Sequence, residues 1–239
     1  MLKIKIESWA AFTPGMEYWE PHPQVITEPI SKKYLMLIPP LLRRRLGFLG
    51  KHAVAAALQI LPEGESIPSI FASRYGDTDL TLSLLKGIGQ GEAMSPTDFS
   101  LAVHNAVSGL FSIARKDHAA VISIAAMEAL VLQTLFEAIG QLDSVERVLC
   151  VIYDIPLPDI DRHYASKDSI PYAIAAVLSR KNGKEYIIEQ CSLGTQNNQP
   201  SESFLETEPF KFIDLLIGKT NEIESEVNGT VWRIKMMGS

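Results

Sequence analysis

The chain has 239 residues, a net charge of −6, 46% hydrophobic residues and 21% charged residues. This composition is typical of a globular protein with a substantial core. The negative charge disfavours a general nucleic-acid binder, which needs a basic face for phosphate contacts. No apolar run approaches the roughly 20 residues that a membrane span requires, and the N-terminus alternates like a strand rather than a signal peptide. We therefore expect a cytoplasmic protein that binds no nucleic acid and has no membrane span.

The sequence shows no sign of a cofactor or a metal site. Its two cysteines, Cys150 and Cys191, lie in apolar, strand-like runs, where buried structural thiols are expected. Neither has the spacing of a metal ligand. The glycines of GIGQGE end a predicted helix, whereas a phosphate-binding loop begins one. We predict no cofactor and no metal.

The first third of the chain predicts strands and helices in alternation. Residues 2–8 alternate between apolar and polar, which indicates a strand. Residues 13–33 contain prolines and aromatic residues without periodicity and predict a loop. Apolar residues recur at helical spacing over 41–61, and Pro62 ends that helix. A short buried strand follows and ends at Gly76.

Two further helices come next. Asp77 can cap the first of them, which Gly87 and Gly89 close. Ser95-Pro96 is typical of a helix start, and we expect this second helix to break near Gly109.

The remaining elements predict a central sheet covered by helices. Residues 121–125 indicate a strand that runs into a helix ending near Gly140, and 146–154 form a uniformly apolar strand of the kind buried on both faces. After a polar loop, two strands flank an Asn182-Gly183 turn. A helix and one closing strand end the chain. The order predicts a single α/β layered domain without an internal repeat.

Glu128 stands at a suggestive corner, in ISIAAMEALVLQ. Many α/β enzymes hold a nucleophile where a strand runs into a helix N-terminus. A carboxylate in the first helical turn is also stabilised by the helix dipole without any chemistry. Residue types alone leave both interpretations open.

Basic and imidazole side chains offer further candidates. Arg43, Arg44 and Arg45 form either a solvated face or a docking patch for an acidic partner. His52 and His104 lie on helices that otherwise look buried, and we expect structural histidines rather than catalytic bases.

Several stretches resemble the N-terminal half of a β-ketoacyl synthase, a thiolase-like enzyme. MSPTDFSLAVHNAVSGLFSI matches a ketosynthase helix of the type ISPxxxxxxxVNxxAGxLxI at Ser95, Pro96, Asn105, Gly109 and Ile113. VISIAAME follows without a gap and resembles a strand of the type SISIATAC. The resemblance extends to Asp154 and fades after the hairpin. The FASR strand followed by SPTDFSxxVHN is most similar to chain-length-factor partners of ketosynthases, such as those of aryl polyene biosynthesis.

The resemblance implies a thiolase-like α/β fold in one domain, 1–239. Residues 1–154 would be the N-terminal half and 155–239 a shortened C-terminal part with a β-hairpin, a helix and a strand. Glu128 falls where a ketosynthase has its nucleophilic cysteine, and no segment matches the histidine and lysine motifs of the second half. The resemblance therefore implies a pseudo-ketosynthase that is not itself an enzyme.

The resemblance also implies partners. An active ketosynthase would form a heterodimer with this chain, or a second copy a homodimer, through the strand made of Val121, Ile122, Ser123, Ile124 and Ala125. The side chains expected to line the partner's acyl tunnel are Thr97, Asp98, Phe99 and Ala102. An acyl carrier protein would dock transiently, with Arg43 to Arg45 as candidate contacts.

Two other functions remain open. The chain could be a decarboxylating or priming enzyme that uses Glu128, or a carrier-protein docking module.

Overall fold

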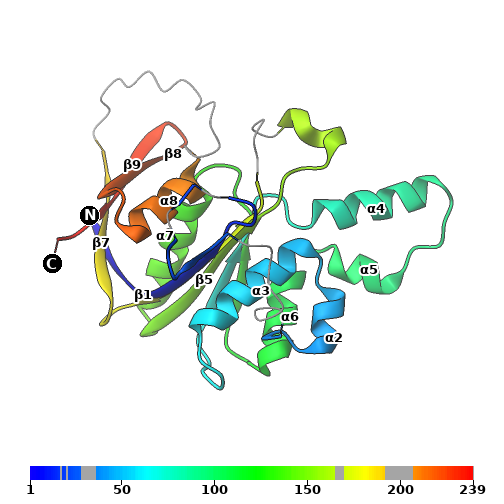
Figure 1. The fold of residues 1–239 in the computed structure, drawn as a ribbon, viewed down its shortest axis with the longest axis horizontal. Helices are drawn as coiled ribbons and strands as arrows, with labels where there is room; N and C mark the ends of the chain where they lie inside the picture. The colour runs from blue at the N-terminus through cyan, green and yellow to red at the C-terminus, as the bar shows by residue number, and fades with distance from the viewer. Residues whose placement is uncertain (17, 20, 28–35, 165–169, 192–206, 239) are drawn as a thin grey trace.

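A computed structural model describes residues 1–16, 18–19, 21–27, 36–164, 170–191 and 207–238 (Figure 1). Their strands form one mixed, nine-stranded sheet in the order β4-β3-β5-β6-β1-β7-β9-β8, with β2 beside β1. The strands are β1 Leu2–Phe12, β2 Val25–Ile26, β3 Ser69–Ala72, β4 Val121–Ile124, β5 Arg147–Asp154, β6 Tyr172–Ser179, β7 Lys184–Gln190, β8 Glu222–Val227 and β9 Thr230–Met236.

Helices cover both faces of this sheet. The helices of the described residues are α2 Pro40–Arg45, α3 Phe48–Ile60, α4 Thr78–Gly89, α5 Pro96–Leu101, α6 Ala106–Arg115, α7 Leu130–Leu142 and α8 Glu208–Ile217, with the 3₁₀ helix η1 at Asp159–Tyr164. Helices α7 and α8 contribute to one buried cluster, and α3 and α6 to a second cluster on the opposite face. The predicted α/β layered fold is confirmed.

The parallel part of the sheet positions the candidate site. Strands β4 and β5 both run parallel to β3, which lies between them, so that Ile70 pairs with Ile122 and with Cys150. The carboxyl ends of the three strands therefore meet at one edge, where open α/β sheets commonly hold their functional residues. β5 and β6 are buried along nearly their whole length because helices cover both of their faces.

Two of the predicted helices differ from the structure. The helix expected over 41–61 is two helices, α2 and α3, because Leu46 and Gly47 are extended and interrupt it. The break expected at Gly109 lies earlier, between α5 and α6, and Gly109 is inside α6. A glycine is tolerated there, whereas Ala102 to Asn105 leave the helical path.

The C-terminal prediction is partly confirmed. The two strands that flank Asn182-Gly183 are present as β6 and β7, and the helix is present as α8. The expectation that these strands form a β-hairpin is wrong, because β1 lies between them and pairs with both. The single closing strand is also wrong, because it is the second strand of a hairpin, β8–β9. Asn228 and Gly229, both with positive φ (50° and 73°), form its turn. β8 reads EIESEV, and its many glutamates concealed a strand at the sheet edge.

The cysteines and the helices bear on two earlier expectations. Cys150 is buried on β5 as predicted, and burial raises the pKa of its thiol above the ordinary value. Cys191 is partly exposed, which the apolar run around it did not predict. Among the described residues, no helix combines the length and the apolar character that crossing a membrane would take.

Candidate functional site at the β4–α7 corner

The corner between β4 and α7 is a tight turn with unusual backbone. β4 ends at Ile124 and α7 begins at Leu130. Ala129, the N-cap of α7, has φ 47° and ψ 49°, in the left-handed region that residues other than glycine rarely adopt. Such conformations persist where the surrounding structure enforces them, often at functional sites. The buried Ala129 therefore sets the angle at which the strand enters the helix.

Glu128 lies on the outer side of this corner. Its side chain is exposed, as is Met127 beside it, and its carbonyl accepts a 2.8 Å hydrogen bond from Gln133 Nε2. Glu128 precedes the helix, whose first turn contains no acidic residue. The expectation that Glu128 serves the first turn of its own helix is wrong. A chemical role for Glu128 stays a prediction.

Another carboxylate serves α7 instead. Glu208, the first residue of α8, accepts hydrogen bonds from the backbone N–H groups of Val131 (2.9 Å) and Leu132 (3.0 Å). Ser225 on β8 donates a third bond of 2.7 Å. Burial raises the pKa of Glu208, and these bonds oppose that rise. Sequence reasoning missed Glu208, because its place at a helix start indicated only a role in α8.

A second buried carboxylate closes the ends of β3 and β5. Asp154 accepts hydrogen bonds from Ser73 Oγ (2.7 Å), the Arg74 backbone N–H (3.0 Å) and the Tyr172 hydroxyl (3.1 Å). Burial raises its pKa, and the bond from Ser73 and the Arg74 charge oppose the rise. Ser73 and Arg74 belong to the FASR sequence, so this sequence joins β3 to β5 and β6.

His52 and His104 both have backbone partners, but only His52 is on a helix, because His104 lies in the break between α5 and α6. His52 is buried, and its Nδ1 donates to the Phe48 carbonyl at 2.8 Å. Burial lowers its pKa. His104 donates from Nε2 to the Ser73 carbonyl at 2.9 Å. Both bonds are those of structural histidines, as expected.

A groove of about 660 Å³ runs between α6 and β4. Ser108 and Ser123 approach each other across its floor, with 3.0 Å between their hydroxyl oxygens. A side chain at Gly109 would meet open space. The groove is lined by His104, Asn105, Ser108, Gly109, Ser112, Val121, Ser123 and Ala125. The small residues of α6 thus leave room beside the edge strand.

The elements around this groove expose apolar side chains. Helices α4 and α5 contain no buried residue and project from the body of the molecule as an arm (Figure 1). The large apolar residues exposed on the arm, on α6, on β4 and at the corner are Leu85, Ile88, Met94, Phe99, Val103, Ile113, Ile122 and Met127. We call this set the apolar face.

The two edges of the sheet differ in chemistry. β8 carries Glu222, Glu224 and Glu226, and Arg233 on β9 pairs with the first two at 3.6 and 2.8 Å. β4, with the sequence VISI, carries no charge, and in the part of the chain that the structure describes β3 is its one neighbour. Charges on an edge strand discourage pairing with another chain, whereas a bare edge invites it.

The predicted site residues fall into two groups. Thr97, Asp98 and Phe99 are exposed on α5, and Ala102 is its C-cap. Because α5 packs on α6 and α6 packs on β4, the structure brings this group near the predicted interface strand, which ends at Ile124 and leaves Ala125 just beyond it.

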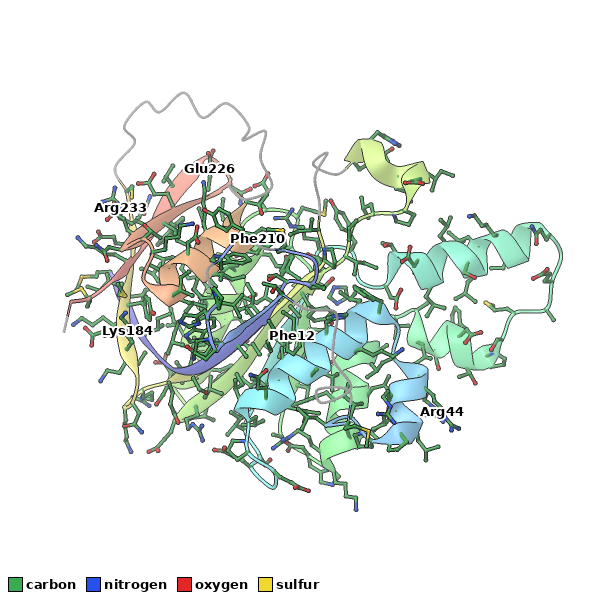
Figure 2. The ribbon with its side chains drawn as sticks, in the orientation of Figure 1. Phe12, Arg44, Lys184, Phe210, Glu226 and Arg233 are labelled. Atoms are coloured by element: carbon green, nitrogen blue, oxygen red, sulfur yellow. The ribbon has the colours of Figure 1, made fainter. Side chains whose placement is uncertain are left out.

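The arginines form the other group, on α2. Arg44 and Arg45 are exposed, and Arg43 is partly covered, with its Nη1 3.3 Å from Met36 Sδ. Figure 2 shows Arg44 on the outer side of α2. Exposed Leu41 and Phe48 flank them. We call Leu41, Arg44, Arg45 and Phe48 the α2 patch.

The mixed sheet between helix layers, with an uncharged edge strand that leads into a buried helix, is the arrangement expected of a thiolase-like α/β protein. The model of the β-ketoacyl synthase N-terminal domain matches residues 16–233. The chain therefore belongs to the β-ketoacyl synthase N-terminal domain family. The match continues past β7 to residue 233, so the expectation that the likeness fades after the predicted hairpin is wrong. A search of curated proteins found no match.

Solved structures share this fold. One chain in the structure of the ketosynthase ApeO in complex with its chain length factor ApeC, from Xenorhabdus doucetiae, aligns with a TM-score of 0.77 and 23% identity. The alignment covers 98% of this chain and 100% of that one. The ishigamide ketosynthase/chain length factor aligns at 0.60, 13% identity, 75% of this chain and 62% of its own. A β-ketoacyl synthase from Burkholderia phymatum aligns at 0.54, 12% identity, 92% of this chain and 71% of its own.

Proposed function

We propose that this chain is the non-catalytic partner subunit, or chain-length factor, of an active β-ketoacyl-carrier-protein synthase. In that role it forms a heterodimer and shapes the acyl tunnel of its partner during type II polyketide or fatty-acid-like elongation, with aryl polyene synthesis as the expected pathway. The observation that carries the proposal is the uncharged edge strand β4 with the apolar face around it.

The apolar face explains why a partner is needed. A monomer that leaves an unpaired apolar strand and a large apolar surface in water is prone to aggregate. A second sheet that pairs with β4 would satisfy its outward N–H and C=O groups. The same partner would cover Ile122 and the arm formed by α4 and α5.

The corner supports a role without catalysis. An exposed carboxylate stands where the family resemblance places the acyl-accepting thiol, and a carboxylate is a poor nucleophile for thioester exchange.

Co-expression with a ketosynthase encoded beside this chain tests the proposal. We expect the two chains to purify together. Ile122→Lys should abolish that association, because pairing through β4 would then bury the charge of the lysine away from water. Ile160→Lys is the matched control, since Ile160 is an exposed isoleucine on η1. If Ile122→Lys and wild type retain the ketosynthase equally, β4 is not the interface strand. The proposal is contradicted if the chain is monodisperse when expressed alone and does not co-purify with the ketosynthase.

A second candidate function, carrier-protein docking, is favoured by the α2 patch. Arginines beside exposed leucine and phenylalanine suit an acidic helix with an apolar stripe, which would bury Leu41 and Phe48 while its carboxylates meet Arg44 and Arg45. The patch is basic although the chain as a whole carries −6.

Charge reversal tests this second function. Arg44→Glu should weaken the binding of acyl carrier protein several-fold at low salt and less at high salt, because salt screens the pairing. Lys184→Glu makes the same change of charge at an exposed residue of β7, far from Arg44 in Figure 2, and should have no effect. Titrations at two salt concentrations measure both. Equal affinities for wild type and Arg44→Glu would show that the patch is only a solvated face.

A further inference from the structure

The Glu208 carboxylate lies at the N-terminus of α7 as well as in the first turn of α8. It lies in the first turn of α8, and its oxygens reach the first turn of α7, where Val131 binds Oε2 and Leu132 binds Oε1. With one main-chain donor on each oxygen and Ser225 as a third donor, the geometry suits an ionised carboxylate. A protonated carboxyl group would be a weaker acceptor for these three donors.

The position of this charge matters because helix N-termini are electropositive. The aligned peptide dipoles of a helix amount to roughly half an elementary charge at its N-terminus. Here both α7 and α8 direct that end at Glu208. The Arg74 guanidinium also acts on this carboxyl group, which burial otherwise makes costly to ionise.

The corner lies at the same end of α7. Glu128 is two residues before the start of the helix. An unopposed helix N-terminus lowers the pKa of a thiol placed there and so activates it. A fixed anion on the first-turn amides opposes that effect at the corner.

We propose that Glu208 is a resident anion that holds the α7 N-terminus and cancels its activating field at residue 128. The α7 N-terminus therefore does not lower the pKa of a group at the corner. A cysteine placed at position 128 would remain mostly protonated at neutral pH and would react slowly as a nucleophile. This inference concerns the electrostatics of the chain itself and is independent of which partner it binds.

A thiol introduced by Glu128→Cys reports this field. In a Cys191→Ser background, where the other cysteine is buried Cys150, its pKa can be read from the pH dependence of iodoacetamide alkylation followed by mass spectrometry. Adding Glu208→Gln should lower that pKa and raise the thiolate fraction at neutral pH about two- to fivefold, the range expected for one helix-end interaction.

Glu226→Gln is the control, because Glu226 is an exposed acid on β8 beside Ser225. It removes the same charge without touching the α7 amides and should leave the thiol pKa unchanged. If Glu208→Gln and Glu226→Gln shift the pKa equally, or neither shifts it, the proposal is wrong.

Acetate provides a second test that does not depend on the stability of Glu208→Gln. Glu208→Ala removes two carbons and the two carboxylate oxygens, which together match an acetate ion. Acetate should raise the melting temperature of Glu208→Ala and return the thiol pKa toward that of the parent protein, while chloride at equal ionic strength should do neither. Acetate that acts no better than chloride would overturn the resident-anion assignment.

Discussion

Gly47 allows the N-termini of α3 and α4 to approach each other, because its side chain is only a hydrogen atom. A Cβ built at Gly47 would lie 2.6 Å from Asp77 Oδ2, closer than such atoms approach. Asp77 cannot easily withdraw, because its other oxygen accepts the Leu80 N–H at 3.1 Å and caps α4. The N-termini of α3 and α4 therefore meet at this contact.

We expect Gly47→Ala to lower the free energy of unfolding by about 1–3 kcal/mol through this overlap, measured by denaturant titration. Gly89→Ala is the control, since a Cβ there meets nothing within 4 Å and alanine favours a helix. Asp77→Ser keeps a capping oxygen on a shorter side chain and should relieve part of the cost when combined with Gly47→Ala. A penalty that is the same with serine or aspartate at position 77 would exclude the contact as its cause.

At the scale of elements, periodicity predicted most helices and strands but not their interruptions. The apolar pattern over 41–61 continues across the extended residues between α2 and α3 and so conceals the break. The contact of Gly47 with Asp77, thirty positions away, cannot be read from that pattern. β8 was missed because an edge strand can carry glutamates on its open side. Local pattern identifies what a segment prefers, whereas tertiary contacts decide where it stops.

The arm formed by α4 and α5 gives an element-scale prediction. If Ala102 enters the tunnel of a catalytic partner, Ala102→Trp should fill space meant for the growing chain and shorten the products. Mass spectrometry of products from the reconstituted complex measures this. Ile160→Trp, on η1, adds the same side chain elsewhere and should leave product length unchanged. Unaltered lengths from an intact Ala102→Trp complex would show that α5 lines no tunnel.

At the scale of the whole molecule, the candidate site joins segments that sequence reasoning kept apart. The corner, its edge strand and the arginines were all recognisable from local sequence and family resemblance. Glu208 and Asp154 were not, because their roles arise only when α8 reaches α7 and when β5 lies between β3 and β6. Segments on both sides of Asp154 thus contribute to both hydrophobic clusters and to the hydrogen bonds of both buried carboxylates.

The central place of β1 has a consequence for how the chain is made. Leu2–Phe12 is synthesised before the other described strands, yet it lies between β6 and β7, which end at Ser179 and Gln190. During translation β1 must wait for most of the chain before it finds its neighbours, whereas β3, β4 and β5 can pair much earlier. Long-range pairings of this kind slow folding and lengthen the time for which unpaired apolar strands can aggregate with other molecules. The order of synthesis thus favours early assembly of the β4 side of the sheet and late insertion of β1.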